Sequence, residues 1–396
     1  MKDIKEKPES KGQGMSRRGF LKASLAGAAA VPLAGLTTDL LAGEGKRTHH
    51  KGPTQGLMID AFCHIMPAKY TEAFAKRSKV RPDVMYTGRF GMASMSTMAD
   101  VDARLRMMDK YPGYVQILNI TGSNPEDLLS PKDAAEVCKI ANDSMAELVY
   151  KYPDRFVAAT AVLPLNDMDE AMKELDRAIK DLRLKGVQVS STIMDKPLDS
   201  PEFRPLFEKM NAYNLPIQIH PKTPSKGPRA LNMAGNDQVG MWAEFAYQWP
   251  YETTIAMGRL VFSGMMEKYP NLKILTHHLG GVVPYHAERV SHFFATSSTR
   301  YAGGAANPSF PKPVLDYYKM IYGDTACYGR VATLMDGFDF FGADHVLFAT
   351  DYPYDAASGD IFIRETINSV EEMDIPDETR KKIFEENARR LFRLPV

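Results

Sequence analysis

The stretch Met58-Ile59-Asp60-Ala61-Phe62-Cys63-His64 is an apolar run that ends on a histidine. Three more apolar runs end on a residue that can bind a metal, namely His220, His278 and Asp351. In a barrel of parallel strands, side chains at the carboxyl ends of the strands converge at one face, where barrel enzymes carry their active sites. The pattern therefore predicts a (β/α) barrel with a metal-assisted active site.

Strand-like runs alternate with helical patterns through the rest of the chain. Eight runs predict strands, at residues 57–62, 114–120, 156–163, 186–190, 216–220, 273–277, 322–326 and 346–350. Helical patterns cover residues 99–111, 131–152, 167–184, 201–213, 251–269, 331–340, 358–372 and 377–391. Eight strand–helix units predict an α/β fold of the TIM (β/α)8 barrel type. We expect the Met- and Gly-rich residues 81–98 to form a loop over the barrel mouth.

Several short motifs, in this order, resemble the amidohydrolase superfamily, and in particular its amidohydrolase-related branch with aminocarboxymuconate semialdehyde decarboxylase and the resorcylate-type decarboxylases. The motifs are Ile59-Asp60-x-x-x-His64, Ile219-His220-Pro221, Trp249-Pro250-Tyr251-Glu252-Thr253, Tyr269-Pro270-Asn271-Leu272-Lys273, His278-Leu279-Gly280-Gly281, Thr350-Asp351-Tyr352-Pro353 and Glu386-Asn387-Ala388-Arg389-Arg390-Leu391-Phe392. Each motif alone is weak, whereas their number and order indicate the family. The resemblance implies one catalytic barrel domain over residues 57–396.

Charge is unevenly distributed along the 396 residues, although the formal net charge is zero. Residues 1–51 carry ten Lys or Arg against five Asp or Glu. The remainder holds 39 basic and 44 acidic residues, a formal charge of −5. This balance gives no reason to expect nucleic acid as a partner.

The basic N-terminus is typical of an export signal. Ser16-Arg17-Arg18-Gly19-Phe20-Leu21-Lys22 resembles a twin-arginine motif, and an uncharged stretch rich in Ala, Gly and Leu follows up to Asp39. That stretch is too short and too rich in small residues for a stable membrane anchor. We expect a signal peptide at residues 1–42, a linker at 43–56 and a periplasmic mature protein; the alternative is a flexible basic tail.

Two imidazoles and one carboxylate, from His64, His220 and Asp351, form the predicted metal site. This set suits a divalent cation and leaves positions open for water or substrate. Zinc is the expected cation, with manganese and iron as alternatives. The resemblance implies a further ligand two residues before His64, a histidine or glutamate in the family. Phe62 stands there, so one ligand is lost. Asp60 shares the inward face and is an alternative donor, although in the family it supports the ligands instead.

The resemblance also assigns catalytic and substrate-binding roles. His278 matches a histidine that acts as general acid or base beside the metal, and Asp351 shares the proton transfer. Strand alternation turns the neighbouring His277 away, so we expect it to pack. Arg289 matches an arginine that binds the substrate carboxylate across the interface of a homodimer; the alternative is a salt bridge on a helix surface. Arg89 is a second candidate for carboxylate binding by analogy.

These features favour an enzyme that decarboxylates an aromatic or unsaturated carboxylic acid without oxidation, and imply a small-molecule carboxylate substrate. The same residues suit a hydrolase of an amide, ester or lactone, and a lactonase that works without metal would tolerate Phe62. A third alternative is a noncatalytic binding barrel in which Phe62 has disabled the site.

Overall fold

The computed structural model describes residues 56–78, 96–121, 124–224, 238–297 and 310–395. The chain divides into two compact units, residues 1–51 and residues 52–396. The predicted signal peptide, and the predicted linker up to residue 55, lie outside the described residues. Within the described ranges, no helix combines the length and the apolar character needed to cross a membrane.

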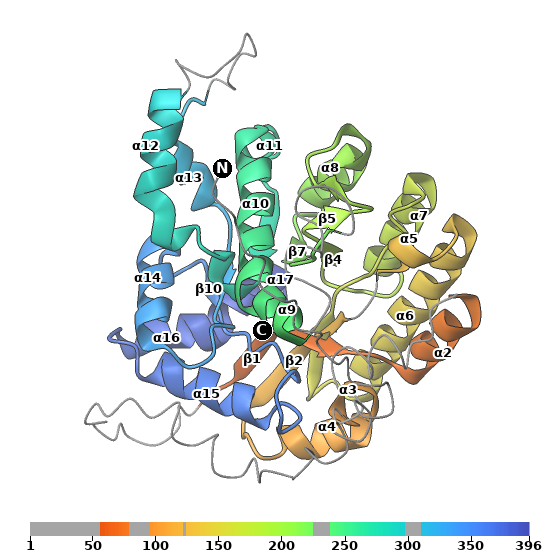
Figure 1. Ribbon diagram of the computed structural model, residues 1–396. Coiled ribbons are helices and arrows are strands. Elements are labelled where there is room, and N and C mark those ends of the chain that lie inside the picture. Colours follow the sequence, from red (N-terminus) through yellow and green to blue (C-terminus); the bar gives the residue numbers. More distant parts are fainter. Residues whose placement is uncertain (1–55, 79–95, 122–123, 225–237, 298–309, 396) are drawn as a thin grey trace, which may run out of the picture. The chain divides into compact units, whose positions relative to one another are not determined.

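Eight parallel strands form a closed barrel in the described part of the chain (Figure 1). They are β1 (Met58–Ile65), β2 (Tyr114–Ile120), β3 (Phe156–Ala159), β4 (Val187–Ser190), β7 (Pro216–His220), β8 (Lys273–Thr276), β9 (Gly323–Asp324) and β10 (Val346–Leu347). Single bridges join β3 to β4 and β8 to β9. The residues after β10 close the ring, because the amide of Asp351 donates to the carbonyl oxygen of Phe62 over 3.2 Å.

Helices surround the strands in Figure 1. The longer ones are α2 (Ala68–Arg77), α4 (Val101–Met108), α6 (Pro131–Lys151), α7 (Met168–Lys180), α8 (Arg204–Tyr213), α10 (Trp249–Phe262), α12 (Ala287–Ser297), α14 (Val331–Phe341) and α15 (Asp360–Glu371). The shorter ones are α3 (Ser96–Ala99), α5 (Pro125–Leu128), α9 (Gln238–Ala243), α11 (Met265–Lys268), α13 (Val314–Tyr318), α16 (Asp377–Lys381) and α17 (Asn387–Phe392). Several begin at a side-chain cap; Ser130, for example, accepts from the amide of Asp133 at the start of α6.

The strands are apolar on both faces, because helices cover the outer face and the filled barrel interior covers the inner one. All eight residues of β1 are buried, as expected for a parallel sheet between a helical layer and a filled interior. One apolar cluster lies between strands and helices, and a second fills the barrel. The second includes Ile59 and Val115 from the strands together with Leu391 and Phe392 of α17. The C-terminal helix therefore packs against the barrel interior.

The predicted TIM barrel is confirmed, and all eight predicted strands are present. The predicted helix 251–269 is interrupted, because Gly264 adopts a left-handed conformation between α10 and α11. The predicted helix 377–391 contains a π-helical turn at Lys382–Glu386 between α16 and α17. Of the predicted loop 81–98, residues 81–95 lie outside the described residues.

Candidate active site

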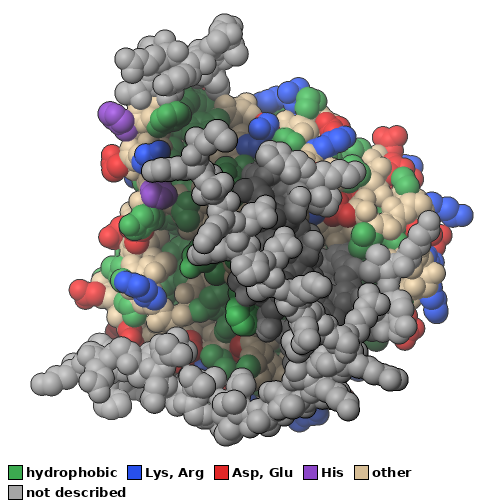
Figure 2. Space-filling view, in the orientation of Figure 1, with side chains coloured by type: hydrophobic (Ala, Val, Ile, Leu, Met, Phe, Trp, Pro, Cys, Tyr) green, Lys and Arg blue, Asp and Glu red, His purple; other side chains and the backbone are tan. Residues whose placement is uncertain are grey.

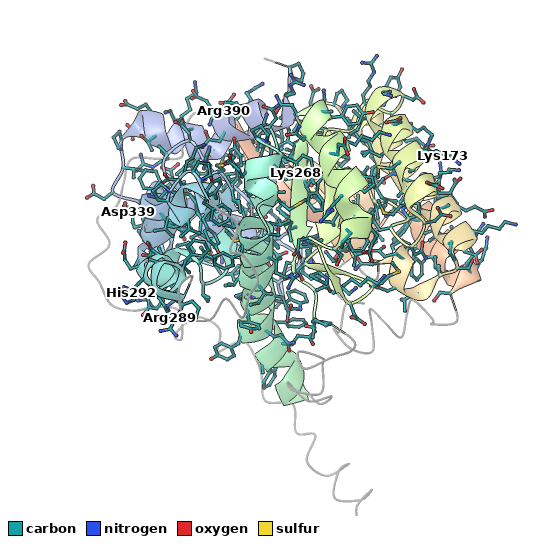
Figure 3. All side chains as sticks on the ribbon, turned by 90° about the horizontal axis from the view of Figure 1, so that it is seen from above. Lys173, Lys268, Arg289, His292, Asp339 and Arg390 are labelled. Carbon is teal, nitrogen blue, oxygen red and sulfur yellow. The ribbon has the colours of Figure 1, made fainter. Side chains whose placement is uncertain are left out.

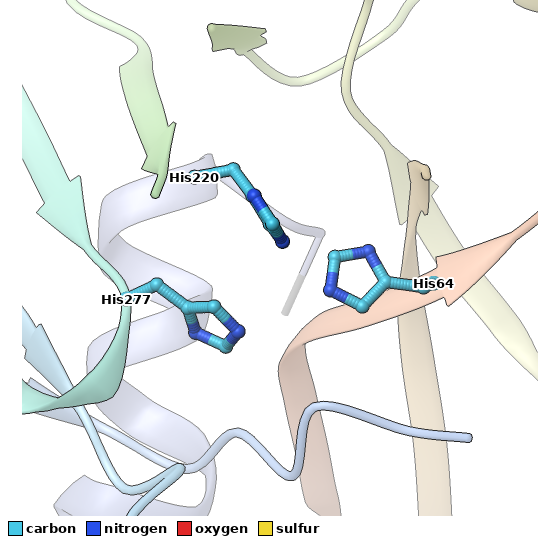
Figure 4. Close-up of side chains that lie close together, drawn as sticks. All are labelled: His64, His220 and His277. Carbon is cyan, nitrogen blue, oxygen red and sulfur yellow. The ribbon is translucent and has the colours of Figure 1, made fainter. Parts of the chain in front are cut away.

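Three histidines from three strands point toward one another at the carboxyl end of the barrel (Figure 4). His64 lies near the end of β1, His220 ends β7, and His277 directly follows β8. One ring nitrogen from each lies within 4.8 Å of the others. His64 and His277 are fully buried, and His220 is partly exposed. The barrel thus brings together two of the predicted ligands and a histidine that was expected to pack.

Asp351, the third predicted ligand, joins this cluster. Its Oδ1 lies 3.0 Å from Nε2 of His64 and 3.1 Å from Nε2 of His277. Its Oδ2 accepts a hydrogen bond from the hydroxyl of Tyr328. Burial disfavours the charge of Asp351, but the adjacent imidazoles outweigh burial and hold the pKa of this carboxyl well below its usual value. Asp351 is therefore a carboxylate, the form that binds metals.

Buried nitrogen atoms in this cluster lack hydrogen-bond partners among the described residues. Such atoms indicate whether a cation would fit the site. In the part of the chain that the structure describes, neither ring nitrogen of His64 has a hydrogen-bond partner, and Nε2 of His220 has none. Such groups cost about 1–3 kcal/mol each unless something else satisfies them. The Nδ1 of His220 lies 2.7 Å from the carbonyl oxygen of Pro221, which leaves the lone pair on Nε2 facing the cluster. A divalent cation fits this donor set.

Burial also sets the protonation of the two predicted histidine ligands. The pKa of His64 is lowered by burial, although Asp351 partly opposes the shift. The pKa of His220 is lowered well below its usual value, again mainly by burial and further by the neighbouring histidines. Both rings are therefore neutral near pH 7, with lone pairs free to bind a cation.

His277 does not pack away from the site, contrary to the expectation from strand alternation. Its Nδ1 lies 2.5 Å from Oδ2 of Asp324, and its Nε2 lies 3.1 Å from Asp351. Burial opposes the charge of this ring, but the two carboxylates prevail and raise the pKa of His277 to about 10. Alternation itself holds here, because Leu275 belongs to the apolar cluster that fills the barrel and His277, two residues later with an extended backbone, shares its face. The expectation was wrong because it placed His278 on that face.

His278, the predicted general acid or base, stacks on His277 with ring centroids 3.9 Å apart. Its Nδ1 lies 3.0 Å from the carbonyl oxygen of Ala326, which places the ring proton there and leaves Nε2 as an acceptor. Burial and the neighbouring His277 lower the pKa of His278 to about 4. The ring is therefore neutral near pH 7.

Phe62 and Asp60 occupy the remaining inward positions of β1. Phe62 is fully buried and lies against the ring of His277, with centroids 4.0 Å apart and planes 15° apart. Both carboxylate oxygens of Asp60 are already engaged. Its Oδ2 accepts from the hydroxyls of Tyr114 and Thr350 over 2.5 Å each, and its Oδ1 accepts from the backbone amides of Phe62 and Thr350 over 3.2 Å each. Asp60 therefore supports the barrel interior and is not available as a replacement ligand.

Arg289, one of the two predicted carboxylate-binding arginines, is not part of this cluster. Arg289 is exposed on α12 and points away from the barrel in Figure 3. It makes no ion pair with another described residue, so the predicted alternative, a helix-surface salt bridge, is absent within those ranges. Arg89 lies outside the described residues.

Aromatic side chains to which the sequence assigned no role in the site line the cluster. The ring of Trp249 meets His220 edge-on at 5.5 Å, and the ring of Tyr354 meets His64 at 5.2 Å. Tyr328 stacks on Phe362 at 4.2 Å. These rings form apolar walls beside polar donors, an arrangement that suits a planar organic ligand. A parallel barrel with converging histidines and an aspartate at its carboxyl face defines a metal-dependent barrel enzyme.

Comparisons with known proteins agree with this class. Residues 59–394 match the amidohydrolase family. The chain is 31% identical over 310 residues to gamma-resorcylate decarboxylase of Polaromonas, which covers 76% of this chain and 89% of the relative. It is 26% identical over 346 residues to 2-amino-3-carboxymuconate-6-semialdehyde decarboxylase of Dictyostelium discoideum, covering 84% of this chain and 91% of the relative.

Solved structures show the same similarity. The 2,6-dihydroxybenzoate decarboxylase of Rhizobium superposes with a TM-score of 0.69 at 27% identity, over 85% of this chain and 99% of that one. A dihydroxybenzoic acid decarboxylase of Polaromonas, with bound manganese, gives a TM-score of 0.71 at 26% identity, over 85% and 97%. The chain therefore belongs to the amidohydrolase family, in its branch of metal-dependent, non-oxidative decarboxylases. It is accordingly a carboxy-lyase, as the sequence predicted.

Proposed function

We propose that the protein decarboxylates a hydroxylated aromatic carboxylic acid, with His64, His220 and Asp351 holding a divalent cation. The observation that carries the proposal is the convergence of His64 and His220 at the carboxyl face of the barrel, with Oδ1 of Asp351 3.0 Å from Nε2 of His64. A cation bound there would supply positive charge for substrate oxygens. The related decarboxylases act on dihydroxybenzoates, which makes hydroxybenzoic acids the substrate class to test first.

His278 and Asp351 handle the proton in this proposal. The neutral His278 has its Nε2 free to accept a proton and to return it to the substrate. Protonation of the ring carbon that bears the carboxylate weakens the bond to that group. The bond then breaks, its electron pair returns to the ring, and carbon dioxide leaves. The aromatic walls formed by Trp249 and Tyr354 keep the ring in place and limit the access of water.

The cation is proposed to be zinc or manganese. Imidazole nitrogen and carboxylate oxygen suit both, and manganese is bound in the related decarboxylase of Polaromonas. Elemental analysis of the purified protein identifies the bound metal.

Two chains are proposed to form a homodimer through the face that carries α10 and α12. Large apolar side chains are exposed there, including Tyr247 at 77%, Tyr285 at 78% and Phe293 at 60%. Figure 2 shows apolar side chains gathering over this face. Arg289 is exposed on the same helix as Phe293, where it would reach the active site of the partner and bind the substrate carboxylate.

The protein is also proposed to be exported to the periplasm by the twin-arginine pathway. The support is the motif around Arg17 and Arg18, followed by an uncharged stretch. This pathway carries proteins that are already folded, which suits a protein that acquires its metal before export.

Release of carbon dioxide from a panel of hydroxybenzoic acids tests the proposed reaction. The panel should include 2,6-dihydroxybenzoate, with amide, ester and lactone substrates beside it. Carbon dioxide from one or more hydroxybenzoates supports the proposal. Hydrolysis of an ester or lactone without release of carbon dioxide would favour the hydrolase alternative instead.

A further inference from the structure

We infer that His277 is the third imidazole ligand of the cation, held in that role by Asp324 and by the ring of Phe62. The inference rests on the proposed metal site and adds residues that have not been assigned to it. On β1 two side chains face the cluster, and only His64 has an atom that can bind a metal. The missing donor is supplied from β8 across the barrel.

Distances around Asp351 support a common ion. Ligand atoms about 2.1 Å from one ion, at angles of about 90–109°, lie about 3.0–3.4 Å apart. Oδ1 of Asp351 lies 3.0 Å from Nε2 of His64 and 3.1 Å from Nε2 of His277. The contact with His64 lacks hydrogen-bond geometry, because Nε2 of that residue has no hydrogen-bond partner. Both contacts have the length of an edge between two ligands of one ion. Without metal, Nε2 of His277 is hydrogen-bonded to Asp351, and a bound cation would displace the proton that they share.

Asp324 determines which nitrogen of His277 faces the cluster. Its Oδ2 lies 2.5 Å from Nδ1 of His277, while its Oδ1 accepts from the amides of Leu279 and Ala326 over 3.2 Å each. The carboxylate is fully buried and fixed at both oxygens. A carboxylate that holds the far nitrogen of a histidine orients the ring and increases the basicity of the metal-facing nitrogen. Asp324 is therefore a positioning residue for His277.

Phe62 and His278 lie on the two faces of His277. The ring of Phe62 is stacked at 4.0 Å and that of His278 at 3.9 Å. The imidazole is therefore confined to a plane in which Nε2 points at the cluster. His278 directs its Nδ1 to the carbonyl oxygen of Ala326, and it also lies close enough to His277 and Asp351 to form a second group of possible ligands, so the test has to separate the two histidines.

Affinity for zinc and manganese, measured by titration of the purified metal-free protein, tests this assignment. His277→Ala is expected to lower the affinity more than 100-fold, and Asp324→Asn by about 10–100-fold. Phe62→Leu, which keeps an apolar residue but removes the stacked ring, is expected to lower the affinity less than Asp324→Asn. The matched control is His286→Ala, an exposed histidine outside the cluster, for which affinity is expected to stay within about threefold, whereas His278→Ala is expected to cost clearly less than His277→Ala. Unchanged affinity in His277→Ala, or an equal loss in His278→Ala, overturns the assignment.

A crystal structure of the zinc-loaded wild-type protein keeps the test valid if the substituted proteins do not fold. Nε2 of His277 is expected about 2.0–2.1 Å from the zinc ion. An ion bound by His278, with His277 still hydrogen-bonded to Asp351, contradicts the inference. Both readouts are independent of turnover, so absence of decarboxylation with His277 bound to zinc would refute the proposed function alone.

Discussion

The guanidinium of Arg104 donates a hydrogen bond from Nη1 to the backbone carbonyl of His64, over 2.7 Å. Arg104 comes from α4, is fully buried, and forms no ion pair with another described residue. Its Nε donates to Oε1 of Gln116 over 2.7 Å, and its charged group lies 4.6 Å from the ring centre of Tyr352. Tyr352 directly follows Asp351 in the chain. Arg104 thus contacts the two chain segments that carry His64 and Asp351.

Replacement of Arg104 by methionine should destabilise the protein and weaken metal binding. Two buried acceptors lose their donor, which costs about 1–3 kcal/mol each. A loss of about 2–6 kcal/mol corresponds to a fall in Tm of roughly 3–8 °C for a domain of this size. Thermal denaturation and metal titration measure the two effects. The control is Arg106→Met on the exposed face of the same helix, which should leave Tm within about 2 °C of the wild type. Equal Tm values for the two variants would refute this role.

Glu126 should make the stability pH-dependent. Burial, with a smaller effect of nearby Asp127, raises the pKa of Glu126 to about 8 from an ordinary value of 4.5. Between these two values the folded state binds more protons than the unfolded state, so the stability falls as the pH rises. Above about pH 8 the loss is complete.

Glu126→Gln removes this titration. The variant should be more stable than the wild type by about 1–4 kcal/mol near pH 8.5, and about equal to it near pH 4.5. Unfolding in urea at the two pH values measures the difference. Glu72→Gln, an exposed glutamate on α2, serves as control and should show no such pattern. A Glu126→Gln variant whose stability relative to the wild type does not depend on pH would contradict the prediction.

Arg289→Ala should raise KM for the carboxylate substrate by about 10–100-fold, because a charge-assisted bidentate pair is lost. Metal content should be unchanged, since Arg289 lies on α12 away from the histidines. Steady-state kinetics measures KM, and elemental analysis measures the metal content. An unchanged KM would contradict the proposed role of Arg289. Full activity of a protein that sedimentation shows to be a monomer would contradict it as well.

Substitution of both Arg17 and Arg18 by lysine should stop export, because the twin-arginine motif is read as a pair. The protein should then collect in the cytoplasm, with its enzymatic activity intact. Cell fractionation and immunoblotting locate it, and Lys11→Arg, a conservative change outside the motif, is the control. Export of the double variant at the wild-type level would rule out this route.

The barrel could be predicted from the sequence because its strands are continuous apolar runs between amphipathic helices. His64, His220 and Asp351 could be predicted because each ends such a run. The inward position of His277 could not, because the sequence does not show which of two adjacent strand-end histidines faces the interior. The structure settles it, since Leu275, two residues before the extended His277, faces the barrel interior.

Asp324 and Tyr328 could not be predicted from a regular pattern. β9 is only two residues long, and Tyr328 has a positive φ of 54°, so no regular pattern relates them to the site. The sequence does contain one indication that Asp324 belongs to the site. It is a carboxylate in the predicted strand 322–326, and other strands of the predicted barrel end on predicted ligands. That position could have been added to the candidate site.

Decarboxylation by the metal-free and the reconstituted protein tests the central claim most directly. The purified protein is treated with a chelator and dialysed, and release of carbon dioxide from the active hydroxybenzoate is then measured before and after addition of zinc or manganese. We predict that the metal-free protein loses at least 99% of the wild-type rate, that one cation per chain restores it, and that His220→Ala is not restored, since ligand loss should cost roughly 100-fold or more. Full turnover by a protein shown to contain no metal would contradict the account.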